Sequence, residues 1–111
     1  SYFAERISKA HEHKIIDFII DPGFGFAKTL EQNFELLNKL ELLQFVGKPI
    51  LAGVSRKSMI YKTLNTTSEK ALNGTTALNM LALQKGAKIL RVHDVKEAME
   101  CVTLFNKLHT D

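Results

Sequence analysis

Three short polar stretches of this 111-residue chain combine the side chain types that bind anions and heterocycles. Residues 21–28 read DPGFGFAK, residues 55–58 read SRKS, and residues 91–94 read RVHD. Lysine and arginine bind phosphate groups through charged hydrogen bonds, and an ionised carboxylate accepts hydrogen bonds from the N–H groups of a ring. Together the three stretches would suit a heterocycle that carries an anionic phosphate group.

Each polar stretch follows an apolar run that predicts a buried strand. The runs cover residues 15–20, 50–54 and 88–92, and they are short and mostly aliphatic, as strands covered on both faces are. Helical spacing of apolar residues predicts helices over 2–12, 30–46, 69–85 and 95–108, with a helical turn at 58–64. This order, in which a first helix precedes three strand–helix units, predicts a parallel sheet with right-handed crossovers.

Two α/β folds accept this order of elements, an open doubly wound sheet and part of an eight-stranded barrel. Both folds bind their ligands at the carboxyl ends of the parallel strands. Because the three polar stretches follow those ends, we expect them to meet on one rim. A complete barrel needs roughly 250 residues, so a barrel would be represented here only in part.

Local signals predict where the helices begin and end. Thr29 and Gln32 have the spacing of a capping box, Asp94 precedes the last helix as a cap, and Gly86 is suited to a left-handed stop. Gly74 inside the predicted helix costs about 1 kcal/mol relative to alanine, and a close helix contact would explain it. The inner side of that helix is predicted to carry Leu72, Ala77, Leu78, Leu81 and Ala82.

Most of the polar residues also have a purely structural interpretation. Asp21 precedes Pro-Gly, a common turn, and Ser55 could cap the short helix that follows it. Arg56 and Lys57 could simply be solvated. Arg91 is harder to explain in this way, because a permanently charged side chain at the end of so apolar a strand needs a partner.

Composition and charge exclude several classes of protein. Apolar residues make up 45% and charged residues 24% of the chain, and the net charge of +3 is too small and too scattered to indicate a nucleic-acid binder. No segment predicts a membrane span. The single cysteine, Cys101, cannot form an internal disulfide, which favours a reducing, cytoplasmic location. His11 and His13 would face apart on a helix, so no metal site is predicted.

The three polar stretches, in this order and at this spacing, resemble the last three motif strands of the dihydropteroate synthase family. The matching residues are DPGFGFAK at 21–28, GVSRKS at 53–58 and RVHDV at 91–95. The resemblance covers nearly the whole chain. It implies that residues 1–111 form the C-terminal segment of a pterin-binding TIM (β/α)8 barrel, about strands six to eight with their helices, and that the N-terminal portion is absent.

The resemblance also implies a reaction, the condensation of 6-hydroxymethyl-7,8-dihydropterin pyrophosphate with para-aminobenzoate. The products are 7,8-dihydropteroate, a folate precursor, and pyrophosphate. Asp21 would accept hydrogen bonds from the pterin ring, and Lys57 would donate to its carbonyl group. Arg91 would stack on the pterin and, with His93 and Ser55, line the anion pocket. The resemblance makes Lys57, Arg91 and His93 the catalytic residues.

The para-aminobenzoate pocket would involve Phe26, Arg56 and the stem of Lys57, and Gly25 is a further expected substrate-binding residue. The family usually uses Mg²⁺, whose ligands would lie in the N-terminal portion. We expect a homodimer through the last helices and an isolated chain with little or no activity. Two alternatives remain open, a segment of a pterin-binding methyltransferase barrel and a non-catalytic dimerisation module.

Overall fold

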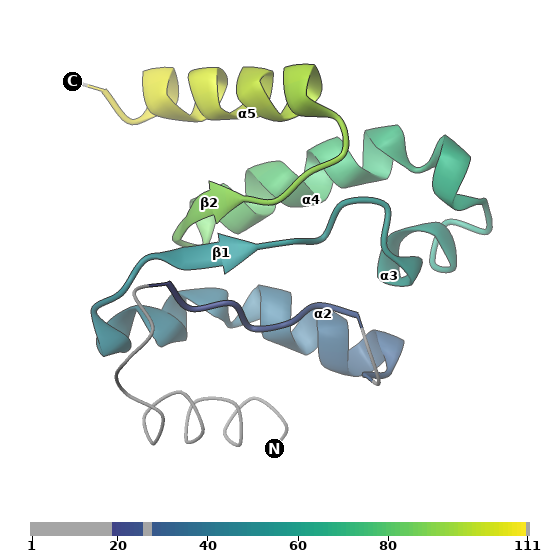
Figure 1. Ribbon diagram of the computed structural model, residues 1–111, viewed down its shortest axis with the longest axis horizontal. Coiled ribbons are helices and arrows are strands. Elements are labelled where there is room, and N and C mark those ends of the chain that lie inside the picture. The colour runs from purple at the N-terminus through teal and green to yellow at the C-terminus, as the bar shows by residue number, and fades with distance from the viewer. Residues whose placement is uncertain (1–18, 26–27, 111) are drawn as a thin grey trace.

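The strands of this protein form a parallel sheet around a buried central strand (Figure 1). The computed structural model describes residues 19–25 and 28–110. Strand β1 (Ile50–Ala52) pairs in parallel with β2 (Ala87–Leu90), and Ile20 forms a parallel bridge to Ile50 on the other side. The predicted strand at 15–20 therefore reaches the sheet at its last residue, and Ile19 before it forms a bend. Residues 15–18 of this strand and the helix predicted at 2–12 lie outside the described residues.

Helices return the chain from the end of each strand to the start of the next. These elements are α2 (Leu30–Asn38), the 3₁₀ helix η1 (Leu40–Val46), α3 (Ser58–Tyr61), the 3₁₀ helix η2 (Ser68–Lys70), α4 (Leu72–Gln84) and α5 (Val95–Leu108). In Figure 1 both strands point to the right, and α2, α4 and α5 run back to the left. All three longer helices therefore begin at the end where the strands finish.

The core lies between β1 and the helices that cover it. Its largest fully buried side chains include Phe24, Leu36, Leu40, Ile50 and Met59. The alternation of buried residues in β1 is weak, because Ile50 and Ala52 are buried and Leu51 is still partly covered. This agrees with the expectation that a parallel strand is covered on both faces.

The structure confirms two predicted helix ends and the predicted close contact of Gly74. The side chain of Thr29 accepts a hydrogen bond from the backbone N–H of Gln32, whose own side chain accepts one from the N–H of Thr29, and this completes the capping box. Gly86 has a φ of +106°, and Gly74 lies against Ile60 of α3. A helix–helix contact therefore explains the glycine inside α4.

The prediction of one continuous helix over 30–46 is wrong. The α-helix ends at Asn38, and the chain continues as the 3₁₀ helix η1 until Gly47, which has a φ of +78°. In a 3₁₀ helix residues three apart share a side. Leu40 and Leu43 are consequently both buried against the core.

The predicted inner side of α4 is also wrong in part. Ala77 is exposed and Leu81 is 49% exposed, whereas Thr75 and Asn79 are buried. The hydroxyl of Thr75 accepts a hydrogen bond from the backbone N–H of Arg56, so a polar contact with the loop after β1 decides which side of the helix faces inward.

Across the described residues no helix is both long and apolar enough to cross a membrane.

Candidate functional site

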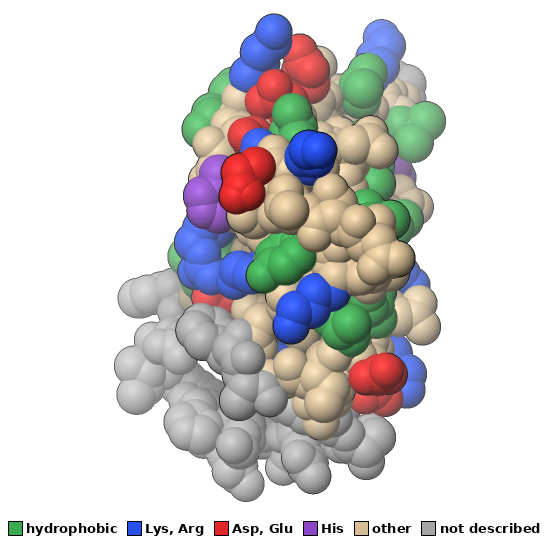
Figure 2. Space-filling view, turned by 90° about the vertical axis from the view of Figure 1, so that its right-hand side faces the viewer, with side chains coloured by type: hydrophobic (Ala, Val, Ile, Leu, Met, Phe, Trp, Pro, Cys, Tyr) green, Lys and Arg blue, Asp and Glu red, His purple; other side chains and the backbone are tan. Residues whose placement is uncertain are grey.

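The ends of the strands meet on one side of the molecule, as the sequence predicts. Three side-chain contacts join stretches far apart in the chain: Arg91 to Asp21, His93 to Ser55, and Asp94 to Arg56. Figure 2 looks onto this end of the molecule and shows basic side chains beside a histidine. The predicted convergence of the three polar stretches is thereby confirmed.

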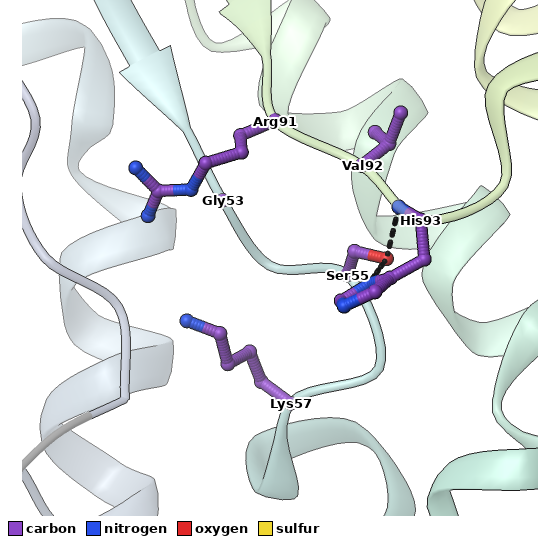
Figure 3. A pocket seen from close by; sticks show the side chains of 6 residues that line it. All are labelled: Gly53, Ser55, Lys57, Arg91, Val92 and His93. Atoms are coloured by element: carbon purple, nitrogen blue, oxygen red, sulfur yellow. Dashed lines mark hydrogen bonds between the residues drawn. The ribbon is translucent and has the colours of Figure 1, made fainter.

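A pocket of about 240 Å³ opens between these strand ends. Its lining is formed by Gly53, Ser55, Lys57, Arg91, Val92 and His93. Figure 3 shows the side chains of Lys57 and Arg91 extending toward the same space, while Ser55 and His93 meet on the other side of it. Two cations and an imidazole therefore surround one concave surface, which suits an anionic group.

Asp21 is held from two directions. Its Oδ1 accepts a hydrogen bond from the backbone N–H of Gly23 at 2.9 Å, which is the turn contact expected of an Asp before Pro-Gly. Its Oδ2 accepts one from Nη1 of Arg91 at 3.0 Å. The two side chains are 38% and 52% exposed. Asp21 therefore shapes the turn and supplies the partner that Arg91 needs, and a ligand can still reach both groups.

Gly53 is a site residue that the sequence reasoning missed. A Cβ atom at this position would lie 2.8 Å from Nη2 of Arg91 and 3.2 Å from its Cζ. The guanidinium thus lies directly over the backbone of the strand end, where a side chain would displace it. The available signal was a glycine inside the otherwise aliphatic run at 50–54.

Lys57 reaches across the pocket toward the loop after Ile20. Its Nζ donates a hydrogen bond to the carbonyl oxygen of Phe24 at 3.1 Å. Burial lowers the pKa of Lys57, the positive charge of Arg91 lowers it further, and Asp21 acts in the opposite direction. A nearby negative charge favours the protonated form of a lysine, so an anion in the pocket would raise the pKa of Lys57 again.

The glycine loop that Lys57 contacts is anchored by α2. Gly25 has a φ of +91°, and a Cβ atom there would lie 3.4 Å from Cδ of Lys57. Its backbone N–H donates to Oδ1 of Asn33 at 2.8 Å, and Asn33 is only 1% exposed. Asn33 was not predicted, although an amide among the apolar residues of a helix is a usable signal.

A polar contact between Ser55 and His93 forms one side of the pocket. Oγ of Ser55 lies 2.8 Å from Nδ1 of His93 and also accepts a hydrogen bond from the backbone N–H of His93 at 3.2 Å. Ser55 is 3% exposed, whereas the His93 side chain reaches solvent. The interpretation of Ser55 as a helix cap is wrong, because Lys57 is the cap residue of α3 and its side chain makes no capping hydrogen bond.

Arg56 points away from the pocket and binds Asp94. Nε and Nη2 of Arg56 each donate to one oxygen of Asp94 at 3.0 Å, and Nη1 donates to the carbonyl oxygens of Ser68 and Glu69. The hydrogen bond lowers the pKa of Asp94 and raises that of Arg56. The interpretation of Arg56 as a merely solvated residue is therefore wrong.

Asp94 stands at the N-cap position of α5, as predicted, but its side chain caps nothing. Both of its oxygens are engaged by Arg56, which has a φ of +53°. The chain direction at Arg56 aims the guanidinium at the start of α5 rather than into the pocket. A bidentate ion pair has replaced the capping hydrogen bond.

Two further predictions concern residues outside the described part of the chain. Phe26 is one of them, as is the pair His11 and His13. Within residues 19–25 and 28–110 no group of three or more His, Cys, Asp or Glu side chains could hold a metal ion. Asp21 and Asp94, the acidic residues at the strand ends, are both paired with arginine.

Comparison with known proteins assigns this chain to a family. A family model described as "Pterin binding enzyme" matches residues 1–93. The dihydropteroate synthase of Escherichia coli K12 is 42% identical over 103 residues, which are 91% of this chain and 36% of that protein. The dihydropteroate synthase of Clostridium beijerinckii is 49% identical over 82 residues, which are 73% of this chain and 30% of that protein.

Solved structures agree in fold as well as in sequence. A crystal structure of Yersinia pestis dihydropteroate synthase matches with a TM-score of 0.90 and 34% identity over 98% of this chain and 49% of that chain. A structure of the Coxiella burnetii dihydropteroate synthase in complex with pteroic acid matches with a TM-score of 0.86 and 39% identity, covering 96% of this chain and 44% of that one.

These matches confirm the prediction of a portion of a TIM (β/α)8 barrel. The chain spans about a third of the length of the curated relatives it matches. With the family model matched over residues 1–93 and this agreement in fold, the chain belongs to the family of pterin-binding enzymes.

Proposed function

We propose that residues 1–111 are the substrate-binding, C-terminal segment of a dihydropteroate synthase. That enzyme condenses 6-hydroxymethyl-7,8-dihydropterin pyrophosphate with para-aminobenzoate and releases pyrophosphate. The observation that carries the proposal is the pocket in which Lys57, Arg91 and His93 come together beside Asp21. The identity of 42% to 49% with curated dihydropteroate synthases supports it.

The pterin ring would bind between Asp21, Lys57 and Arg91. The carboxylate of Asp21 would accept hydrogen bonds from ring N–H groups, and Nζ of Lys57 would exchange the Phe24 carbonyl for a ring carbonyl. The planar guanidinium of Arg91, half exposed above Gly53, would stack on the flat ring. Each of these groups is already held by a protein partner, so little order has to be created when the ligand binds.

The pyrophosphate group would lie beside Arg91, His93 and Ser55. In the proposed reaction the bond between the pterin methylene carbon and the pyrophosphate oxygen breaks, and the electron pair leaves with the pyrophosphate. The amine nitrogen of para-aminobenzoate then bonds to that carbon and loses a proton. The protein's part is to stabilise the charge of the leaving group and to align the amine, and no side chain acts as a nucleophile.

Para-aminobenzoate would bind near the glycine loop, with Gly25, Phe26 and the stem of Lys57 as neighbours. The close contact between Gly25 and Lys57 supports this part of the proposal. Arg56 is engaged by Asp94 and by two carbonyl groups. We therefore propose that Arg56 serves this pocket by holding the loop after β1 in place rather than by direct contact.

The described residues do not fit a magnesium site, because the carboxylates at the strand ends are both paired with arginine. Magnesium ligands, if this protein follows the family, belong to the part of the relatives that the chain does not match.

We also propose a cytoplasmic location, a homodimer through the last helices, and little or no activity of the 111-residue chain by itself.

A hybrid enzyme gives the most direct test of the proposed function. The matching segment of Escherichia coli dihydropteroate synthase is replaced by this chain, and pyrophosphate release is measured with both substrates. We expect activity in the hybrid, and a loss of at least about tenfold in kcat/KM with Asp21→Ala or Lys57→Ala, since each removes a hydrogen bond to a charged group.

Lys62→Ala is the matched control, because Lys62 is exposed at the end of α3. A folded hybrid that shows no activity, or one in which Asp21→Ala and Lys57→Ala act like the control, would contradict the proposal. Turnover of a methyl-folate instead of para-aminobenzoate would favour the alternative, a pterin-binding methyltransferase.

A further inference from the structure

We propose that Ser55 is a positioning residue that fixes the tautomer and the orientation of His93, so that a neutral imidazole presents its Nε2–H to the pocket. The role of Ser55 follows from the hydrogen bonds alone. The identity of the anion that His93 would meet rests on the proposed function.

The hydrogen bonds of the Ser55 hydroxyl can be counted. A serine hydroxyl has one hydrogen to donate and two lone pairs to accept with. The backbone N–H of His93 occupies one lone pair of Oγ at 3.2 Å, and Nδ1 of the same residue lies 2.8 Å away. Ser55 is 3% exposed, and the described residues offer its hydroxyl hydrogen no acceptor other than Nδ1. The hydroxyl therefore donates to Nδ1.

This assignment determines where the imidazole carries its proton. A ring nitrogen that accepts a hydrogen bond is unprotonated, so the neutral ring carries its hydrogen on Nε2. If Nδ1 were protonated instead, Oγ would accept two N–H groups, and its own hydrogen would be buried without a partner, which costs about 1–3 kcal/mol. One buried oxygen thus binds both the backbone and the ring of His93, and this double contact also restrains the ring orientation.

A neutral donor suits the charges already present in the pocket. Lys57 and Arg91 are close enough for the charge of Arg91 to lower the pKa of Lys57. A third positive charge at His93 would add to this repulsion whenever no anion is bound. The Nε2–H group adds a directed hydrogen bond to a bound anion without adding charge to the empty pocket.

The tautomer can be measured directly by NMR. In the ¹⁵N-labelled chain at about pH 8, above the usual pKa of histidine, long-range ¹H–¹⁵N spectra distinguish protonated from unprotonated ring nitrogens. The signal of His93 is identified by its loss in His93→Gln. We expect protonated Nε2 in the native chain and in Ser55→Thr, which keeps the hydroxyl, and a mixture of tautomers in Ser55→Ala. Protonated Nδ1 in the native chain would overturn the proposal, and so would an unchanged tautomer in Ser55→Ala.

Binding of inorganic pyrophosphate tests the consequence for the anion. By calorimetry we expect Ser55→Ala to bind pyrophosphate about tenfold more weakly, because the donor is no longer held in place, and Ser55→Thr to bind like the native chain. Thr103→Ala removes an exposed hydroxyl from α5 and is the control. Unchanged affinity in Ser55→Ala, together with an altered tautomer, would refute the link to anion binding.

The two experiments separate this inference from the proposed function. A native chain with protonated Nε2 that binds no pyrophosphate would support the role of Ser55 and count against the pyrophosphate site. If Ser55→Ala does not fold, as judged by circular dichroism, the tautomer of the native chain and of Ser55→Thr still decides the matter.

Discussion

The charged side chains at the strand ends are stabilised or destabilised by residues that follow other strands. The positive charge of Arg91 is paired with Asp21, and that of Arg56 is paired with Asp94. Lys57 donates to a neutral carbonyl group and is partly buried, and burial together with Arg91 lowers its pKa. The lowered pKa means that the positive charge of Lys57 is disfavoured in the folded protein.

This cost predicts a dependence of stability on pH. The ordinary pKa of lysine is 10.5, and the folded value of Lys57 lies below it. Between the two values the unfolded chain binds more protons than the folded chain, so the free energy of unfolding rises with pH. We expect native protein to gain stability relative to Lys57→Met as the pH rises from 7 toward 10.5, measured by urea unfolding.

The control for this measurement is Lys62→Met, at an exposed position in the same region. Its difference from the native protein should stay constant over the same pH range. An equally constant difference for Lys57→Met would show that the folded protein does not disfavour the charge of Lys57.

At the scale of elements, contacts between loops and helices decide how the strand ends are presented. Arg56 joins the loop after β1 to the start of α5 and to η2 through four hydrogen bonds. Its backbone N–H also binds Thr75 of α4. The loop that carries Ser55 and Lys57 is therefore fixed to three helices, and these contacts hold the backbone of both pocket residues in place.

The contact between α3 and α4 predicts that Gly74→Ala destabilises the protein. Alanine is favoured over glycine in a helix by about 1 kcal/mol. A Cβ atom at position 74 would, however, lie 2.5 Å from Cγ2 of Ile60 and 3.0 Å from Cδ1 of Leu64, and Ile60 is only 2% exposed. Overpacking of this kind costs about 1–3 kcal/mol, so we expect a net loss of stability in urea unfolding.

Asn73→Ala provides the comparison, because Asn73 is an exposed residue of the same helix. This change alters helix propensity without crowding and should stabilise the protein slightly. In Gly74→Ala combined with Ile60→Ala, the nearer of the two crowding atoms is gone, and the added alanine should cost less stability than it does in the presence of Ile60. A stabilising Gly74→Ala would disprove the close packing of α3 and α4.

At the scale of the whole molecule, α5 lies at the edge of the fold (Figure 1) and carries several exposed apolar side chains. Val95, Met99, Leu104 and Leu108 are each at least 60% exposed. Leu81 of the neighbouring α4 is 49% exposed as well. Exposed apolar side chains on both flanks of the helix are suited to being covered by another protein surface, and they support the proposed homodimer through the last helices, in which they would form the contact surface.

We expect the chain to self-associate through this surface, and Met99→Lys to weaken the association by at least about tenfold, because a charge would have to be buried in the contact. Sedimentation equilibrium measures the dissociation constant. Thr110→Lys adds the same charge at an exposed position beyond α5 and should leave it unchanged. A native chain that stays monomeric at high concentration would exclude this interface.

The sequence by itself determined the order of the longer helices and the strands in the described part of the chain, several of their ends and the side of the molecule where the polar strand ends meet. These features depend on interactions that are short in sequence, such as the capping box of Thr29, or on a rule of topology, since parallel strands end on the same side. The motifs at the strand ends were also sufficient to indicate the family, because three such stretches in one order and at one spacing form a specific pattern.

Only the tertiary structure decided which polar side chains are paired. Asp94 has the sequence position of a helix cap, yet it binds Arg56, 38 residues earlier, and Arg91 finds its partner 70 residues away in Asp21. The exposed Leu81 of α4 and the buried Thr75 likewise reflect neighbours from other elements. Which polar side chains pair depends on their distance and burial in the folded chain. The spacing of residues along the sequence gives neither of these quantities.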